Sequence, residues 1–188
     1  MKPRWILAVF AVVAAAQLAV PVGMIAKREA TLRYGRAYKF RTRPVDPYDA
    51  FRGRYVWLGF EQDHAPWRAS HGAIHGTKAY ALIEEGTNGF AAVREVMSQP
   101  PAAGEYVEVR VSQWGWNSGP VYFTLPFDRY YMEETKAPAA ERAYWQSNRR
   151  SQTNLTTYAV VRIRNGESVL ENLYVDGQPI AEYVRTHK

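Results

Sequence analysis

The stretch TYAVVRIRNGESVLENLYV, residues 157–175, decides the fold of this chain. Each half has the length of a β-strand. Between the halves stands Asn165-Gly166, the strongest short-range signal for a two-residue hairpin turn, because such a turn needs a positive φ at both central positions. The stretch therefore predicts two antiparallel strands, 157–164 and 168–175. Asp176-Gly177 predicts a further turn directly after them.

After Gly35 apolar and polar residues begin to alternate, as in half-buried strands. This alternation predicts further strands at 36–43, 55–60, 78–84, 90–96, 105–114 and 121–125. Residues 61–77 contain three His and few aliphatic residues and are expected to form a loop, and 137–148 is the one helix expected in this part. About eight short strands separated by turns predict a mainly β fold. We expect an antiparallel sheet or barrel-like domain with one short helix.

An apolar segment, WILAVFAVVAAAQLAVPVGMIA, occupies residues 5–26. A helix of about 20 apolar residues is long enough to cross the hydrocarbon core of a bilayer. We therefore divide the chain into an N-terminal transmembrane anchor, 1–26, and a β-rich domain, 27–188. A cleavable signal peptide is the alternative, since the small residues 14–16 suit cleavage before Gln17.

The positive charge of the chain is concentrated beside this segment. Residues 27–54 hold nine Lys or Arg against three Asp or Glu, whereas 55–188 hold 13 against 15. A basic stretch next to a bilayer attracts anionic lipid headgroups. We expect those headgroups as a partner and no nucleic acid, because nucleic-acid-binding domains spread their Arg and stacking aromatics over the folded body.

The side of the membrane on which the domain lies depends on two opposing signals. A positive-inside count places it in the cytoplasm, but large C-terminal domains translocate largely regardless of charge. A short basic start followed by an apolar run is typical of an export signal. We expect an extracytoplasmic domain. The chain has no Cys, which excludes thiol catalysis, disulfides and Cys-ligated zinc.

Two groups of carboxylates are candidates for catalysis. Asp46 and Asp49, with Arg52 close behind, can form a pair for general acid–base work. Turn capping and a salt bridge to a neighbouring Arg account for the same residues. Glu133 and Glu134 precede the predicted helix, where acidic residues also favour the helix dipole. The alternative function is therefore an extracytoplasmic hydrolase that uses a carboxylate pair.

His64, His71 and His75 can present three imidazoles to zinc or copper, although loop His are more often plain surface residues. We assign neither a metal nor a cofactor. The sequence has no Gly-x-Ser-x-Gly elbow, no Ser-x-x-Lys motif and no phosphate-cradling Gly loop. Without a complete catalytic constellation, a non-catalytic interaction module is the leading hypothesis.

Three segments of the chain resemble the GDYXXLXY family of bacterial membrane-anchored proteins. They are PVDPYDAFRGRYVWLGF at 44–60, DRYYMEE at 128–134 and LYVDG at 173–177. The family pattern Gly-Asp-Tyr-x-x-Leu-x-Tyr is matched here at Gly53, Tyr55 and Leu58, whereas Arg54 replaces the Asp and Phe60 replaces the last Tyr. An Arg in place of the motif Asp makes a structural role for this segment easier to defend than a catalytic one.

The resemblance covers most of the chain after the anchor. It implies a bacterial membrane-anchored protein, and together with the apolar segment and the export signal it leads us to expect a single pass through the inner membrane and a periplasmic domain. It also implies an accessory or assembly role beside a multi-span membrane protein, with no defined activity. The candidate binding residues in and around the motif segments are Asp46, Asp49, Arg52, Gly53, Tyr55, Arg129 and Glu134.

Overall fold

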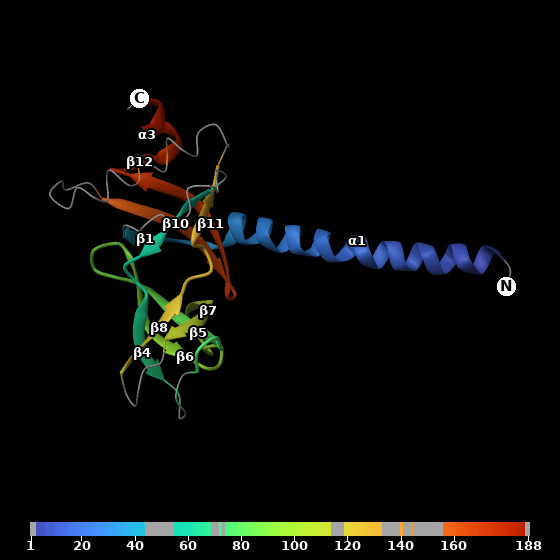
Figure 1. Cartoon of the computed structure of the whole chain (residues 1–188), viewed down its shortest axis with the longest axis horizontal. Coiled ribbons are helices and arrows are strands. Elements are labelled where there is room, and N and C mark those ends of the chain that lie inside the picture. The colour runs from blue at the N-terminus through green and yellow to red at the C-terminus, as the bar shows by residue number, and fades with distance from the viewer. Residues whose placement is uncertain are drawn as a thin grey trace.

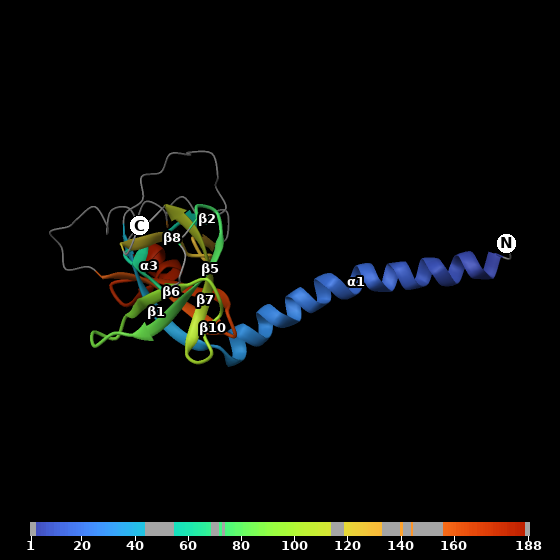
Figure 2. The same cartoon turned by 90° about the horizontal axis from the view of Figure 1, so that it is seen from below.

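One long helix projects from a β-rich domain in the computed structural model (Figure 1). The structure describes residues 3–43, 55–68, 72, 74–113, 119–132, 140, 144 and 156–186. The helix, α1, spans Pro3–Tyr34 and contains the predicted apolar segment 5–26. It is long enough and apolar enough to cross a membrane. Its apolar side chains do not pack on the domain: Leu7 and Phe10 are 73% and 70% exposed. Figure 2 shows the same separation of helix and strands from a second side.

The last turns of α1 pack on the domain. Thr31 is buried there and its hydroxyl donates to the carbonyl of Lys27, while the Lys27 ammonium forms an ion pair with Glu167. The helix ends where the Gly35 amide donates to the carbonyl of Thr31 over 2.8 Å, and β1 begins at Arg36. No linker therefore separates the helix from the first strand.

A five-stranded sheet lies next to this helix end. Its strands follow the order β12-β11-β10-β1-β3, and every neighbouring pair is antiparallel. They are β1 Arg36–Arg43, β3 Gly59–Phe60, β10 Thr157–Arg164, β11 Glu167–Val175 and β12 Gln178–Pro179. Asn165 and Gly166 have φ values of 50° and 81°, which confirms the predicted hairpin turn.

A closed barrel forms the second part of the domain. Its strands follow the order β4-β6-β5-β7-β8, and β4 closes it by pairing with both β6 and β8. They are β4 His64–Arg68, β5 Lys78–Glu85, β6 Ala91–Met97, β7 Glu105–Gln113 and β8 Pro120–Thr124. Among the described strand pairs of this barrel, only β4–β6 is parallel. The predicted mainly β, antiparallel and barrel-like fold is confirmed.

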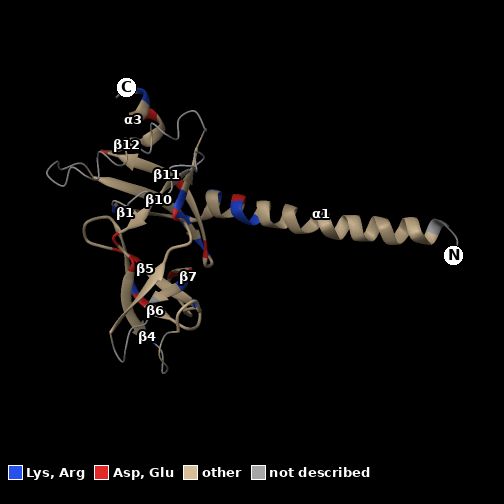
Figure 3. Ribbon diagram, viewed as in Figure 1, with Lys and Arg blue, Asp and Glu red and all other residues tan. Residues whose placement is uncertain are grey.

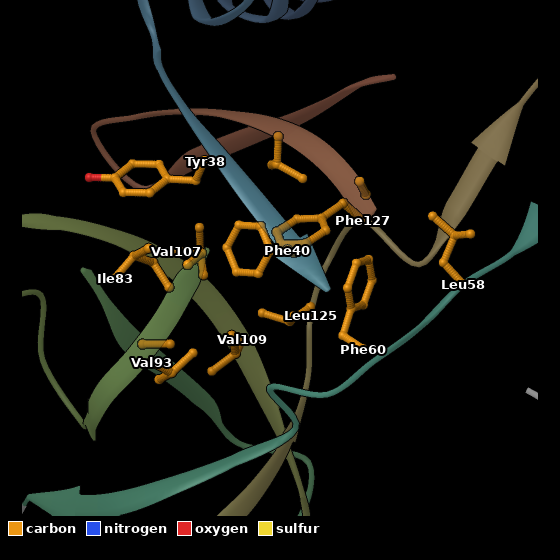
Figure 4. Close-up of a cluster of buried hydrophobic side chains, with 14 of the residues drawn as sticks. Tyr38, Phe40, Leu58, Phe60, Ile83, Val93, Val107, Val109, Leu125 and Phe127 are labelled. Atoms are coloured by element: carbon orange, nitrogen blue, oxygen red, sulfur yellow. The ribbon is translucent and has the colours of Figure 1, made fainter. Parts of the chain in front are cut away.

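The sheet and the barrel share one hydrophobic core. Figure 4 shows Tyr38 and Phe40 of β1 pointing toward the barrel residues Val107 and Val109. The rings of Phe40, Phe60 and Phe127 form a cluster with centroid separations of 5.0–6.1 Å. All of these side chains are buried, and the β-branched residues among them suit a pleated, packed surface. The alternation that predicted the strands thus marks the residues that join the two parts.

Two predictions for the middle of the chain were wrong. Residues 61–77 were expected to form a loop, but His64–Arg68 is strand β4, because β6 and β8 supply hydrogen-bonding partners that the local sequence does not indicate. Residues 55–60 were expected to form one strand. They divide at Leu58, whose amide donates to the carbonyl of Asp128, so that β2 Tyr55–Trp57 pairs with β9 Arg129–Tyr131 and β3 pairs with β1.

Helices differ in part from the expectation. Of the predicted helix 137–148 the structure describes Ala140 and Tyr144, which are helical and buried, and the Tyr144 hydroxyl donates to the carbonyl of Arg43 over 2.9 Å. A short helix that was not predicted, α3 Ile180–Thr186, follows β12 and buries Ile180 and Val184.

Candidate functional site

Of the seven candidate binding residues, the structure describes two. Asp46, Asp49, Arg52, Gly53 and Glu134 lie outside the described residues, as does Glu133, so the carboxylate pair of the hydrolase alternative stays a prediction. Tyr55 begins β2 and Arg129 begins β9. These strands pair antiparallel, with Tyr55 opposite Tyr131 and Trp57 opposite Arg129. The first two motif segments therefore lie side by side in space.

The β2–β9 ribbon presents different chemistry on its two faces. Trp57 and Tyr131 are 44% and 66% exposed, and the guanidinium of Arg129 lies 5.4 Å from the centre of the Trp57 ring. On the other face Val56 is fully buried and Tyr130 is half-buried. The ribbon thus exposes two aromatic rings and an Arg on one face, while its other face packs on the core.

Tyr130 connects the ribbon to the third motif segment. Its hydroxyl donates to Oδ1 of Asn172 over 3.0 Å, directly before Leu173, and the same amide oxygen accepts from the Leu173 backbone. Burial, with a smaller contribution from Tyr174, raises the pKa of Tyr130 above its usual value. All three motif segments therefore meet at this ribbon, which gives their joint occurrence in the sequence a structural reason.

A cleft of about 570 Å³ lies beside Arg129, between the barrel, the β10–β11 turn and α1. Its walls include three guanidinium groups, from Arg28 of α1, Arg110 of β7 and Arg129 of β9. Such a volume is typical of small-molecule sites. Apart from Arg4 near its start, the charged residues of α1 all follow residue 26, at the domain end of the helix (Figure 3).

The carboxylates of this cleft are already engaged. Glu108 forms an ion pair with Lys78 at 2.6 Å, and this hydrogen bond raises the pKa of Lys78. Glu167 is paired with Lys27, and Asp128 lies 3.6 Å from Arg129. Within the described part of the chain, Arg28 and Arg110 have no ion pair. The three Arg and three carboxylates of the lining balance in number, but Lys27 and Lys78 from outside the lining neutralise two of the carboxylates, which leaves the guanidinium groups of Arg28 and Arg110 available.

A smaller pocket of about 290 Å³ lies on the other side of Asp128 and Leu125. The carboxylate of Asp63 is its main polar group, and it binds Arg43 and Nδ1 of His64, each at 2.7 Å. The carboxylate is therefore already engaged by neighbouring side chains of the domain. We regard this pocket as part of the packing between β3 and the barrel.

The three His residues considered for metal binding have separate surroundings. His64 contacts Asp63, and Nδ1 of His75 lies 2.7 Å from the carbonyl oxygen of Ser112. His71 lies outside the described residues. Across the described ranges no group of three or more His, Asp or Glu has a metal-binding arrangement.

Sequence reasoning missed the aromatic partners of the ribbon and the cleft residue Arg110. Tyr131 stands two positions after Arg129, so the period-two spacing of a strand would have placed both on one face. Trp57 stands in the same way two positions after Tyr55. Arg110 has no comparable local signal, because it is one of several charged residues on the outer face of an alternating strand.

Comparison with known proteins finds a match to a family model. No curated protein matches the chain, and no solved structure matches it. The family model described as "GDYXXLXY protein" matches residues 17–173, which include the first two motif segments and Leu173, the first residue of the third. Because this match covers far more than half of the chain, it agrees with the resemblance seen in the motifs. The chain belongs to the GDYXXLXY family.

Proposed function

We propose that this chain is a non-catalytic accessory module for a multi-span membrane protein. In this proposal α1 crosses the inner membrane of a bacterium once and the domain lies on the periplasmic side. The continuous helix from the apolar segment into the domain supports close attachment. The short basic start before that apolar segment supports export of the domain.

The exposed ribbon face carries this proposal. Trp, Tyr and Arg are the residue types that most often dominate the binding energy of protein interfaces. Trp57, Arg129 and Tyr131 stand together on one face of a backbone whose other face is buried. Arg129 also shares a cleft with Arg28 of α1, so this face lies near the membrane helix. A partner in the same membrane can therefore reach it.

Anionic lipid headgroups are the second proposed partner. Lys27 and Arg28 are the first charged residues after the apolar segment, and Arg33, Arg36 and Lys39 follow at the membrane end of the domain. Basic residues near an anionic bilayer surface contribute about 1 kcal/mol each. This attraction would hold the domain close to the headgroups and keep the β2–β9 ribbon at a constant distance from the membrane surface.

Cross-linking in native membranes followed by affinity capture tests the partner proposal. The full chain and the Tyr122→Ala control, which removes another exposed aromatic ring, are expected to enrich the same multi-span protein. The Trp57→Ala/Tyr131→Ala variant should recover at least about tenfold less of it, since loss of one interface anchor of about 2 kcal/mol or more has that effect. Equal recovery by all three proteins, or no reproducible partner at all, would contradict the proposal.

Membrane orientation is testable separately because the chain has no Cys. Thr87 is exposed in the turn between β5 and β6. A Thr87→Cys variant is expected to react with a membrane-impermeant maleimide once the outer membrane is permeabilised and the inner membrane is intact. Labelling only after the inner membrane is disrupted would place the domain in the cytoplasm.

A further inference from the structure

The cleft between α1 and the barrel lies at the depth of the lipid headgroups if α1 spans the membrane as proposed. Residues 5–26 form about 33 Å of helix, slightly more than the hydrocarbon core of about 30 Å. Lys27 and Arg28, which come next, therefore fall in the interfacial layer. Arg28 lines the cleft, and the Lys27–Glu167 ion pair holds the β10–β11 turn at the same level.

We infer that this cleft binds the phosphate of one anionic membrane lipid between Arg28 and Arg110. This inference rests on the proposed membrane attachment. The two guanidinium groups line the same cleft and have no ion pair in the described part of the chain. Guanidinium groups bind phosphate oxygens through paired, charge-assisted hydrogen bonds. The acyl chains of a lipid held there would extend beside α1 into the bilayer.

The charge pattern of the cleft selects an anion. Five cations, Arg28, Arg110, Arg129, Lys27 and Lys78, stand in or around it against the carboxylates of Glu108, Asp128 and Glu167. The Lys residues neutralise two of these carboxylates and Arg129 lies beside the third. A phosphodiester would therefore meet uncompensated positive charge, whereas a zwitterionic headgroup would also bring a cation close to the Arg residues.

The test measures lipid retention by the full chain purified in detergent. Native mass spectrometry with added short-chain phosphatidylglycerol is expected to show one tightly bound lipid, and phosphatidylcholine is expected to bind more weakly. Arg110→Ala should weaken phosphatidylglycerol binding about tenfold, because a hydrogen bond between charged groups is worth that factor or more. Arg28→Ala should have the same effect.

Arg94→Ala is the matched control. Arg94 is exposed on β6, has no ion pair among the described residues and does not line the cleft, so its removal gives the same charge change on the same barrel. Equal lipid retention by Arg94→Ala and Arg110→Ala would overturn the inference. Arg110 has no ion pair to lose within the described ranges, and unchanged thermal unfolding of Arg110→Ala would show that the fold is intact.

Two further outcomes distinguish a lipid site from a site for soluble phosphates and from the partner surface. Glycerol 3-phosphate has the same phosphate chemistry without acyl chains, and binding as tight as that of the lipid would overturn a lipid as the occupant. The partner proposal fails or stands independently. Suppose that the Trp57→Ala/Tyr131→Ala variant retains the lipid and that every variant captures the same amount of the membrane protein. The lipid site then stands, and the partner surface is refuted.

Discussion

Replacing Gly35 with Ala adds one methyl group at the point where α1 meets the sheet. A Cβ there would lie 2.4 Å from the Thr31 carbonyl oxygen and 3.0 Å and 3.2 Å from the backbone oxygen and nitrogen of Ile163. All three neighbours are backbone atoms, so no side chain can rotate away. The helix end and β10 must therefore separate to accommodate the methyl group.

The expected cost follows from two opposing terms. Replacing an unstrained Gly with Ala usually stabilises a protein by about 0.4–1 kcal/mol through the unfolded state. Overpacking costs about 1–3 kcal/mol. Separation also weakens the bonds from the Gly35 amide to Thr31 and from Arg162 to the Gly35 carbonyl, and one such bond is worth about 1 kcal/mol. We expect Gly35→Ala to lower the free energy of unfolding by about 1–3 kcal/mol.

Denaturant unfolding of the full chain in detergent measures this change, and amide exchange at residues 31–36 shows whether the junction opens. Gly72→Ala is the control, because a Cβ at Gly72 meets nothing within 4 Å. It should be neutral or slightly stabilising. If Gly35→Ala were as stable as Gly72→Ala, with unchanged exchange at the junction, the packing argument would be refuted.

Three further changes test separate features of the domain. The buried hydroxyl of Thr42 donates to that of Thr157 over 2.9 Å, so either single Thr→Val variant should cost about 1–3 kcal/mol, and the double variant should cost less than the sum of the two single variants in a denaturation cycle. Burial raises the pKa of Tyr130 above 10.0, so the unfolded chain loses that proton first as the pH rises. Stability should therefore fall from pH 10.0 upward, and Tyr130→Phe should show a smaller fall in alkaline denaturation titrations. Gly166 has a φ of +81°, and a Cβ there would lie 2.6 Å from the Tyr106 ring, so Gly166→Ala should lower the unfolding midpoint. Adding Tyr106→Ala should remove the steric contact but not the backbone strain, so it should recover only part of this loss.

Strands joined by a short turn could be predicted from the sequence, because all the information lies within a few residues. The hairpin at 157–175 is the clearest example, and its Asn165 and Gly166 adopt the positive φ values that the turn requires. The pairing of β1 with β10 could not be predicted, since no local pattern in 36–43 specifies a partner so far along the chain. Strand β4 was missed for the same reason, because it is extended through its pairing with β6 and β8 and no local pattern indicates these partners.

The candidate site was predictable only as separate pieces. Tyr55 and Arg129 were chosen from motif segments, but their positions on adjacent strands depend on the division of the chain at Leu58. Arg110 belongs to an alternating strand whose outward residues look alike in the sequence. The cleft around Arg110 forms only because the β10–β11 turn and α1 lie beside its strand. The cleft therefore depends on the assembled domain and could not be predicted from the local sequence.

The pairing of β1 with β10 also constrains the order in which the molecule can be made. β1 is synthesised directly after α1, and its partner comes near the end of the chain. At about 5–20 residues per second, synthesis of the intervening residues takes on the order of ten seconds. During that interval the barrel strands, which are close together in sequence, can pair with one another. The surface that packs on α1 can close only after the chain has passed Ile163, so the last turns of the helix gain their packing partners only when the domain is nearly complete.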